Sequence, residues 1–331
     1  MGIREDFNHS RYIPGQKKGH YESFFQRANH PTRPLAFWIR YTVFSPENDP
    51  ASAIGELWAI YFDGEKNSHI AVKKEVPIRE CEFDRNRFGA KVADAFLNQS
   101  ELAGQVKQGK NSISWNLSFG SDAQPLFDFP ESMYSTALPK AKVLVGMPLA
   151  RFDGSLTVNG QKVQVKSWLG SQNHNWGSKH TDHYAWGQVA GFDHSEDTFL
   201  ELATAKLKFG PIWTPALTPI VLRHRGQEFR LNQLIKTMGR ASFGFFDWDF
   251  HASSAEIKIK GRITAKREDF VCLKYYNPPG GFKYCLNSKI ARCDLEILSS
   301  SSSHAEMLTS KSRAAFEILT DSNDHGMSPA C

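Results

Sequence analysis

The stretch "AEIKIKGRITAK" (residues 255–266) indicates the fold class, because apolar and polar residues alternate along it. In an extended chain, its isoleucines fall on one face, and its lysines and arginine fall on the other. Such alternation is typical of a strand with one buried face and one face in water. The stretch therefore predicts a half-buried β-strand.

Similar runs recur along the whole chain, separated by turn-forming pieces such as "FDGEKN", "VNGQK" and "NPPGG". Helical periodicity is scarce. The best helical candidate, "ADAFLNQSELAG" (residues 93–104), also fits a pair of strands. Many short strands without a βαβ rhythm predict an all-β fold, in which antiparallel sheets close into barrels and leave few exposed edges. The length fits two tandem barrels, which we place at residues 1–170 and 171–331.

Composition excludes several classes of protein. The 331 residues carry 40 Lys and Arg against 35 Asp and Glu, and this surplus is scattered rather than gathered in a basic stripe, so we expect no nucleic-acid partner. Five cysteines at irregular spacing predict neither a disulfide framework nor a paired-cysteine zinc site. With no signal-like start and no apolar run as long as a membrane span, we expect a soluble cytoplasmic protein. The oligomeric state stays open.

Common catalytic motifs are missing from the sequence. It contains no GxSxG elbow, P-loop or GxGxxG, so serine hydrolases, NTPases and dinucleotide oxidoreductases lose their usual support. We therefore expect no cofactor.

The densest group of polar and aromatic residues is "GSQNHNWGSKHTDHYAWGQVAGF" (residues 170–192). As a strand, its last part places the side chains of Tyr184, Trp186, Gln188 and Phe192 on one face and small residues on the other. Such a face suits the wall of a cavity for an apolar ligand. It equally suits a core strand whose polar groups are satisfied by packing.

Ahead of this strand, the turn-like segment "NHNWG" carries His174 and Trp176. A histidine at a cavity mouth can donate a proton or orient a water molecule, although it can equally cap a loop. The ring of Trp176 can stabilise a carbocation. His180 and His183 add the possibility of a metal site, but in a strand they point to opposite faces, and no HExxH motif or cysteine accompanies them, so we expect no metal.

Charged residues also fall among aromatics elsewhere. Trp38 and Arg40 share a face of "AFWIRYTVF", and Glu56 and Trp58 share a face of "GELWAIYFD". If these runs are neighbouring strands, Arg40 and Glu56 are placed to form a buried ion pair, for which a purely structural role is also open.

A second charged group lies in "FGFFDWDF", where Asp247 and Asp249 share one strand face. Two like charges placed so can raise the pKa of one carboxyl and give a general acid. Alternatively, both residues are exposed.

The block "WLGSQNHNWGSKHTDHYAWGQ", supported by "YESFF", "WIRYTVFSP" and "GELWAIYFD", resembles the hydroxyneurosporene synthase (carotenoid 1,2-hydratase) and AttH-like group. That group is related to tocopherol cyclases and lipocalin-like Diels–Alderases. The resemblance implies two lipocalin-like barrels, with an apolar ligand in one barrel or between the two. It also implies hydration or cyclisation of isoprenoid or polyketide substrates without a redox cofactor.

These observations together predict a hydratase or cyclase that works by acid catalysis in an aromatic-lined cavity. The predicted catalytic residues are His174 and Tyr184. The predicted substrate-binding residues are Asn175, Trp176, Trp186, Gln188, Trp38, Arg40, Glu56 and Trp58. A carrier of a lipid or pigment is the alternative, since it needs the same cavity but no proton donor. A structural protein with a filled core is a third possibility.

Overall fold

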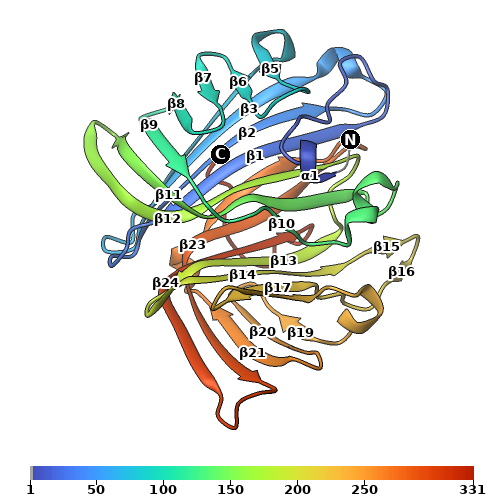
Figure 1. Ribbon diagram of the computed structural model, residues 1–331. Coiled ribbons are helices and arrows are strands. Elements are labelled where there is room, and N and C mark those ends of the chain that lie inside the picture. Colours follow the sequence, from blue (N-terminus) through green and yellow to red (C-terminus); the bar gives the residue numbers. More distant parts are fainter. Residues whose placement is uncertain (1–2) are drawn as a thin grey trace.

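The computed structural model describes residues 3–331, apart from the side chains of residues 209, 234 and 235, and it consists almost entirely of antiparallel strands (Figure 1). This confirms the predicted all-β class. The described helical pieces are short: α1 (Ile3–Asp6) and the 3-10 turns η1 (Pro50–Ser52), η2 (Ile78–Glu80), η3 (Glu131–Ser135), η4 (Leu234–Thr237) and η5 (Arg267–Asp269). No helix in the described range is long and apolar enough to cross a membrane.

The first sheet has twelve strands and runs in the order β4-β3-β2-β1-β12-β11-β9-β8-β7-β6-β5, with β10 beside β11. Its strands are β1 (His20–Asn29), β2 (Leu35–Ser45), β3 (Ile54–Asp63), β4 (Ile70–Pro77), β5 (Cys81–Phe83), β6 (Ala90–Val92), β7 (Ala95–Leu97), β8 (Glu101–Gln108), β9 (Asn111–Gly120), β10 (Leu126–Phe127), β11 (Ala141–Val158) and β12 (Gln161–Gly177). The sheet curls until β4 contacts β8 and β9, which nearly closes it into a barrel.

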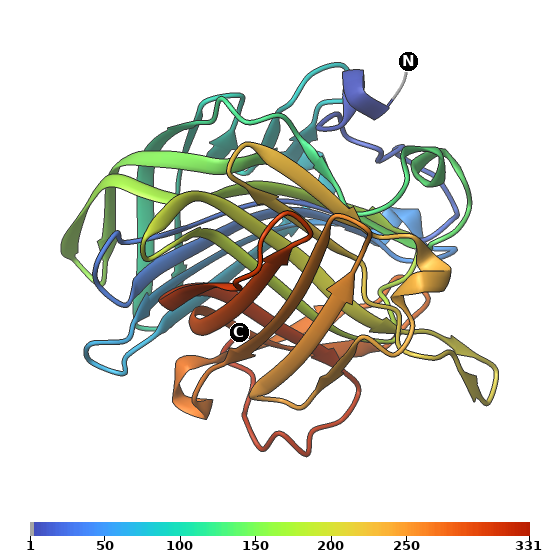
Figure 2. The same ribbon diagram turned by 60° about the horizontal axis from the view of Figure 1, so that its bottom comes forward.

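The second sheet has ten strands and is curved into a half-barrel, in the order β18-β17-β14-β13-β24-β23-β21-β20-β19, with β22 beside β23. Its strands are β13 (His183–Phe192), β14 (Ser195–Lys206), β17 (Ile220–His224), β18 (Gln227–Leu231), β19 (Ala241–Phe243), β20 (Asp247–Ser253), β21 (Ile257–Thr264), β22 (Val271–Tyr276), β23 (Phe282–Ser299) and β24 (Glu306–Thr320). A separate hairpin, β15 (Lys208–Phe209) and β16 (Ile212–Trp213), projects from this half of the protein (Figure 2).

Local sequence patterns agree with these strands. In β21, the isoleucines are buried and the lysines are exposed, as the alternation predicts. Residues 93–104 form β7 and the start of β8, so the strand pair is correct and the helix is wrong. The predicted domain boundary at residue 170 falls inside β12, whereas the change of sheet comes between Gly177 and His183.

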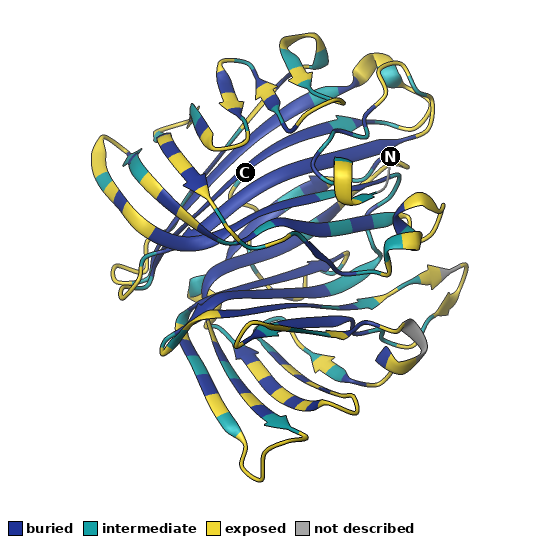
Figure 3. Ribbon diagram, in the orientation of Figure 1, coloured by how far each residue is buried: buried dark blue, intermediate teal, exposed yellow. Residues whose placement is uncertain are grey.

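Strands β1, β2 and β3, together with β12 from Trp168 onward, are almost completely buried, because one face lines the first barrel and the other packs on the second sheet (Figure 3). This double burial explains why these runs are rich in aromatics rather than strictly alternating. We call the layer between the two sheets the seam. Its apolar part consists of Phe25, Ala36, Trp38, Trp58, Ile60, Phe62, Ala71, Trp186, Val271, Leu273, Tyr275, Cys285, Ile290, Ala315 and Leu319.

Candidate functional site

Strand β12 divides the histidine-rich block between two environments. The segment expected to be a turn is the continuous end of this strand, and His174 lies opposite Phe24 of β1. Because Phe24 belongs to the core of the first barrel, His174 and Trp176 face that barrel. Asn175, one position along, faces the seam. The predicted site residues of this block therefore do not share one cavity wall.

His174 is fully buried, and both of its ring nitrogens are engaged. Nδ1 lies 2.7 Å from the carbonyl oxygen of Phe7, which only accepts, so Nδ1 carries a proton. Nε2 lies 2.8 Å from Oε1 of Glu22. Neither nitrogen is free to reach a bound molecule in this arrangement.

Glu22 is also fully buried and gathers donors from the amino-terminal segment. Its carboxylate accepts from the Ser10 hydroxyl at 2.8 Å and from the backbone N–H groups of Arg11 at 2.7 Å and Tyr12 at 2.9 Å. Burial alone would raise the pKa of Glu22, but hydrogen bonds from His174 and His20 outweigh it and hold the pKa well below its usual value. The pair formed by Glu22 and His174 thus fastens the amino-terminal segment to the first barrel.

On β13, the side chains of Tyr184, Trp186 and Gln188 face the seam, as the sequence predicts. Phe192 does not join them. A bulge between Ala190 and Phe192, at Gly191 with φ of 76°, turns Phe192 into the core of the second sheet. The prediction that the Phe192 side chain shares a face of β13 with Tyr184 is therefore wrong.

Gln188 is the centre of a buried polar network that joins the two sheets. Its Oε1 accepts from Arg27 Nε at 2.7 Å and from the Ser171 hydroxyl at 2.6 Å. Its Nε2 donates to Asn173 Oδ1 and to Glu201 Oε2, both at 2.8 Å. All hydrogen-bonding positions of this amide are occupied, so Gln188 fixes its neighbours rather than offering a free group.

Glu201, in the middle of β14, is completely buried and meets a second carboxyl. Trp186 donates to its Oε1 at 2.6 Å, and the buried carboxyl of Asp128 lies beside it. Burial raises the pKa of Glu201 to about 8. Burial, followed by the neighbouring charge of Glu201, raises the pKa of Asp128 well above its usual value. Two buried carboxyls placed together therefore hold at least one proton at neutral pH.

The predicted neighbours Trp38, Arg40, Glu56 and Trp58 do lie on the seam face of paired strands β2 and β3. The expected ion pair between Arg40 and Glu56 is not found within the described part of the chain. Instead, Glu56 pairs with Lys73 at 2.6 Å.

Arg40 contacts two other residues instead of Glu56. Its Nε donates to the hydroxyl of Ser23 at 2.8 Å, and its guanidinium lies 4.5 Å from the ring centre of Tyr275. The sequence did not predict Lys73 of β4 as the partner of Glu56, because the run that contains Lys73 has the pattern of a solvent-exposed segment.

The seam also holds buried polar atoms without a protein partner, among them Trp38 Nε1 and Asn175 Oδ1. Buried polar atoms nearly always have a hydrogen-bond partner, supplied by protein, water or ligand. These two atoms therefore mark places in the seam where a bound molecule or water is expected.

Several residues of the network were not predicted. These are Arg27, Asn173, Ser171, Asp128, Glu201, Lys289 and Glu317. For Glu201, the signal is present in "TFLELATAK", where a charged residue stands in the middle of an apolar run. Lys289, by contrast, gains its partner Glu317 at 2.7 Å only because β23 pairs with β24.

The remaining candidates lie apart. His180 stacks on Tyr21 at 3.9 Å, and burial lowers its pKa to about 3. Asp247 and Asp249 are about half exposed, and each pairs with Arg262, at 3.4 and 3.3 Å. The exposed alternative for these two carboxyls is thus the correct one.

Comparison with solved structures identifies the fold, because structures such as the following three share this two-sheet, lipocalin-like arrangement over nearly the whole chain. A putative AttH from Nitrosomonas europaea has a TM-score of 0.59 and 10% identity, and it covers 94% of this chain and 98% of its own. Kievitone hydratase from Nectria haematococca has a TM-score of 0.59 and 12% identity, and the match covers 96% of this chain and 98% of the hydratase. CghA has a TM-score of 0.57 and 10% identity, and the match covers 94% of each chain.

The chain belongs to the tocopherol cyclase-like family, whose profile matches residues 61–318. Two uncharacterized proteins from strains of Mycobacterium tuberculosis are 28% identical over 208 residues, which is 62% of this chain. The chain spans only 61% of the length of these relatives. The resemblance to the AttH-like group and its cyclase relatives is thereby confirmed.

Proposed function

We propose that this protein is a hydratase or cyclase that acts on an apolar, isoprenoid-like or polyketide-like substrate by acid catalysis in the seam. The observation that carries the proposal is the buried pair of Asp128 and Glu201, in which burial raises the pKa of both carboxyls and so favours a shared proton at neutral pH. Membership of the tocopherol cyclase-like family supports it, as do solved structures of the same fold that include a hydratase.

In the proposed reaction, the carboxyl pair gives its proton to one carbon of a C=C bond. The π electrons form the new C–H bond and leave a cation on the neighbouring carbon. In a hydratase, water supplies an electron pair to this cation; in a cyclase, a hydroxyl of the substrate does so. The proton released by that oxygen returns to the carboxylate, and the pair is restored.

The surrounding residues suit this chemistry. Trp186 holds Glu201 through its N–H, and its ring lies 5.4 Å from the ammonium of Lys289, so its π face is directed toward positive charge. The hydroxyl of Tyr184 has no hydrogen-bond partner among the described residues, which leaves it available to position the attacking oxygen. We assign His174 to positioning, since its nitrogens are held by Phe7 and Glu22.

The test is incubation of the protein in D₂O with a panel of linear polyenes and prenylated phenols, followed by mass spectrometry. Hydration adds D₂O to the substrate, and cyclisation gives an isomer with one stable C–D bond. We expect Asp128→Asn to abolish C–D formation, while Asp122→Asn, the same substitution at an exposed position, leaves it unchanged. Retained C–D formation in a folded Asp128→Asn protein would remove the pair from the reaction.

The carrier function remains the alternative, because the network around Gln188 also serves simply to join the two sheets. The same experiment separates the two. A carrier binds panel compounds and returns them without deuterium, in the natural protein as well as in the variants.

A further inference from the structure

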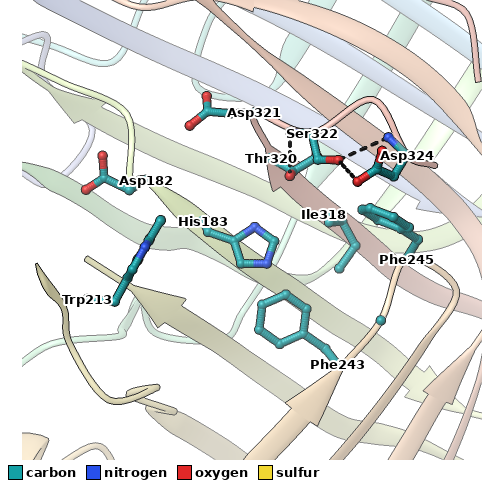
Figure 4. Close-up of a pocket in the computed structure, with 11 residues that line it drawn as sticks. Asp182, His183, Trp213, Phe243, Phe245, Ile318, Thr320, Asp321, Ser322 and Asp324 are labelled. Atoms are coloured by element: carbon teal, nitrogen blue, oxygen red, sulfur yellow. Dashed lines mark hydrogen bonds between the residues drawn. The ribbon is translucent and has the colours of Figure 1, made fainter. Parts of the chain in front are cut away.

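A pocket of about 380 Å³ opens at the mouth of the second sheet, away from the seam (Figure 4). Its wall combines apolar side chains from three places in the sequence: Trp213 of the β15–β16 hairpin, Phe243 and Phe245 near β19, and Ile318 of β24. Its volume lies within the range of small-molecule sites, roughly 300–1,000 Å³. The pocket is thus large enough for a compact apolar molecule.

His183 is the polar group set into this apolar wall. It precedes Tyr184 on β13, so its side chain lies on the opposite face from the seam and points into the pocket beside Phe243, with ring centres 4.9 Å apart (Figure 4). Nδ1 donates to the carbonyl oxygen of Leu319 at 2.9 Å. The tautomer of the ring is therefore fixed with the proton on Nδ1.

The other nitrogen, Nε2, is consequently a hydrogen-bond acceptor. Burial is the main cause that lowers the pKa of His183, so the ring is neutral at pH 7. No residue in the described part of the chain hydrogen-bonds to Nε2. A half-buried acceptor without a protein partner in an apolar wall is open to a donor, either water or a hydroxyl of a bound molecule.

The carboxylates at the rim of the pocket do not need a bound cation to balance their charge. Asp182 is paired with Lys179, and Asp321 is paired with Lys283 at 2.7 Å. Asp324 accepts from the hydroxyl of Ser322 at 2.7 Å. Their charges are balanced or hydrogen-bonded locally, which favours a neutral ligand.

We propose that this pocket binds a neutral apolar molecule that carries a hydroxyl group, with the hydroxyl donating to Nε2 of His183 and the apolar body against Trp213, Phe243 and Phe245. This binding site is separate from the seam, and it does not depend on the proposed reaction.

The test compares two probes of equal shape, 2-naphthol and 2-methylnaphthalene, by equilibrium dialysis against the full-length protein. Only the naphthol can donate to Nε2. The measured quantity is the ratio of the two Kd values, since partitioning differences between the probes cancel when variants are compared. We expect His183→Phe to reduce the preference for naphthol by roughly 3- to 10-fold, the usual range for one hydrogen bond. His194→Phe, in the exposed β13–β14 turn, should leave it unchanged.

An equal ratio in the natural protein and in His183→Phe would overturn the proposal, and so would failure of both probes to bind. If His183→Phe does not fold, the ¹⁵N signal of His183 Nε2 decides the matter in the natural protein. Naphthol should move this signal and methylnaphthalene should not, whereas equal shifts would contradict the assigned hydrogen bond. Loss of the D₂O reaction with intact naphthol binding, or the reverse, keeps the two sites distinguishable.

Discussion

Replacing Asp128 by Asn tests whether the carboxyl pair really holds a proton. In an unfolded chain, both carboxyls lose their protons near pH 4, whereas burial raises the pKa of Glu201 to about 8 and that of Asp128 well above its usual value. Between these limits, the folded protein binds more protons than the unfolded chain. Its free energy of unfolding must therefore fall as the pH rises.

The size of the effect follows from the number of extra protons. One retained proton lowers the free energy of unfolding by about 1.4 kcal/mol per pH unit, or about 2 kcal/mol between pH 6.5 and 8. This window avoids His180, whose lowered pKa makes stability rise with pH only below about 6.5. For a chain of this length, 2 kcal/mol corresponds to about 3 °C in melting temperature.

The amide introduced by Asp128→Asn can still donate a hydrogen bond to Glu201, but it takes up no proton. We therefore expect the melting temperature of Asp128→Asn to change by about 3 °C less than that of the natural protein between pH 6.5 and 8. Differential scanning calorimetry at closely spaced pH values measures this, with Asp122→Asn as the control for a lost surface charge. Parallel curves for the natural protein and Asp128→Asn would refute the reasoning.

Three further predictions concern the buried polar groups and the seam. Glu22→Gln should lower the free energy of unfolding at pH 7 by roughly 3 kcal/mol, because His174 loses its carboxylate partner, and it should expose the amino-terminal segment to limited proteolysis. In the natural protein, the same stabilisation should be lost as the pH falls below about 4.5. In that range Glu22 takes up a proton in the unfolded chain but still resists protonation in the folded one. Lys73→Ala should cost roughly 3–5 kcal/mol in urea unfolding, since it leaves Glu56 buried and unpaired. Trp58→Ala, in the apolar part of the seam, should cost a similar 3–5 kcal/mol through the cavity it creates, and an intact urea midpoint would contradict its packing.

Strand periodicity was enough to predict the all-β class, because it is a local property of the sequence. The pattern of β21 shows this directly, with buried isoleucines and exposed lysines. The face of each residue was equally predictable until a bulge intervened. At Gly191, one extra residue reversed the face of Phe192. Glycine favours such bulges, but Gly187 of the same strand pairs regularly, so the sequence did not show which glycine would be bulged.

Partners across strands were predictable only in part. Arg40 and Glu56 were placed on neighbouring strands, and β2 does pair with β3. However, the charged partner of Glu56 is Lys73, which comes from the next strand, β4. Pairing of a charge depends on three-dimensional distances that strand alternation does not contain.

The position of the candidate proton donor follows from the two-faced strands of the seam. A strand buried on both faces must place polar side chains in one core or the other, and each must find a partner there. Strand β12 shows this on both faces: His174 is hydrogen-bonded to Glu22 on the barrel side, and Asn173 is hydrogen-bonded to Gln188 on the seam side. On the barrel side, the carboxylate is Glu22, whose pKa is lowered by its hydrogen-bond donors, so Glu22 has no proton to transfer. The seam side ends in Glu201, where burial raises the pKa instead, and this is why acid chemistry is expected between the sheets rather than inside the first barrel.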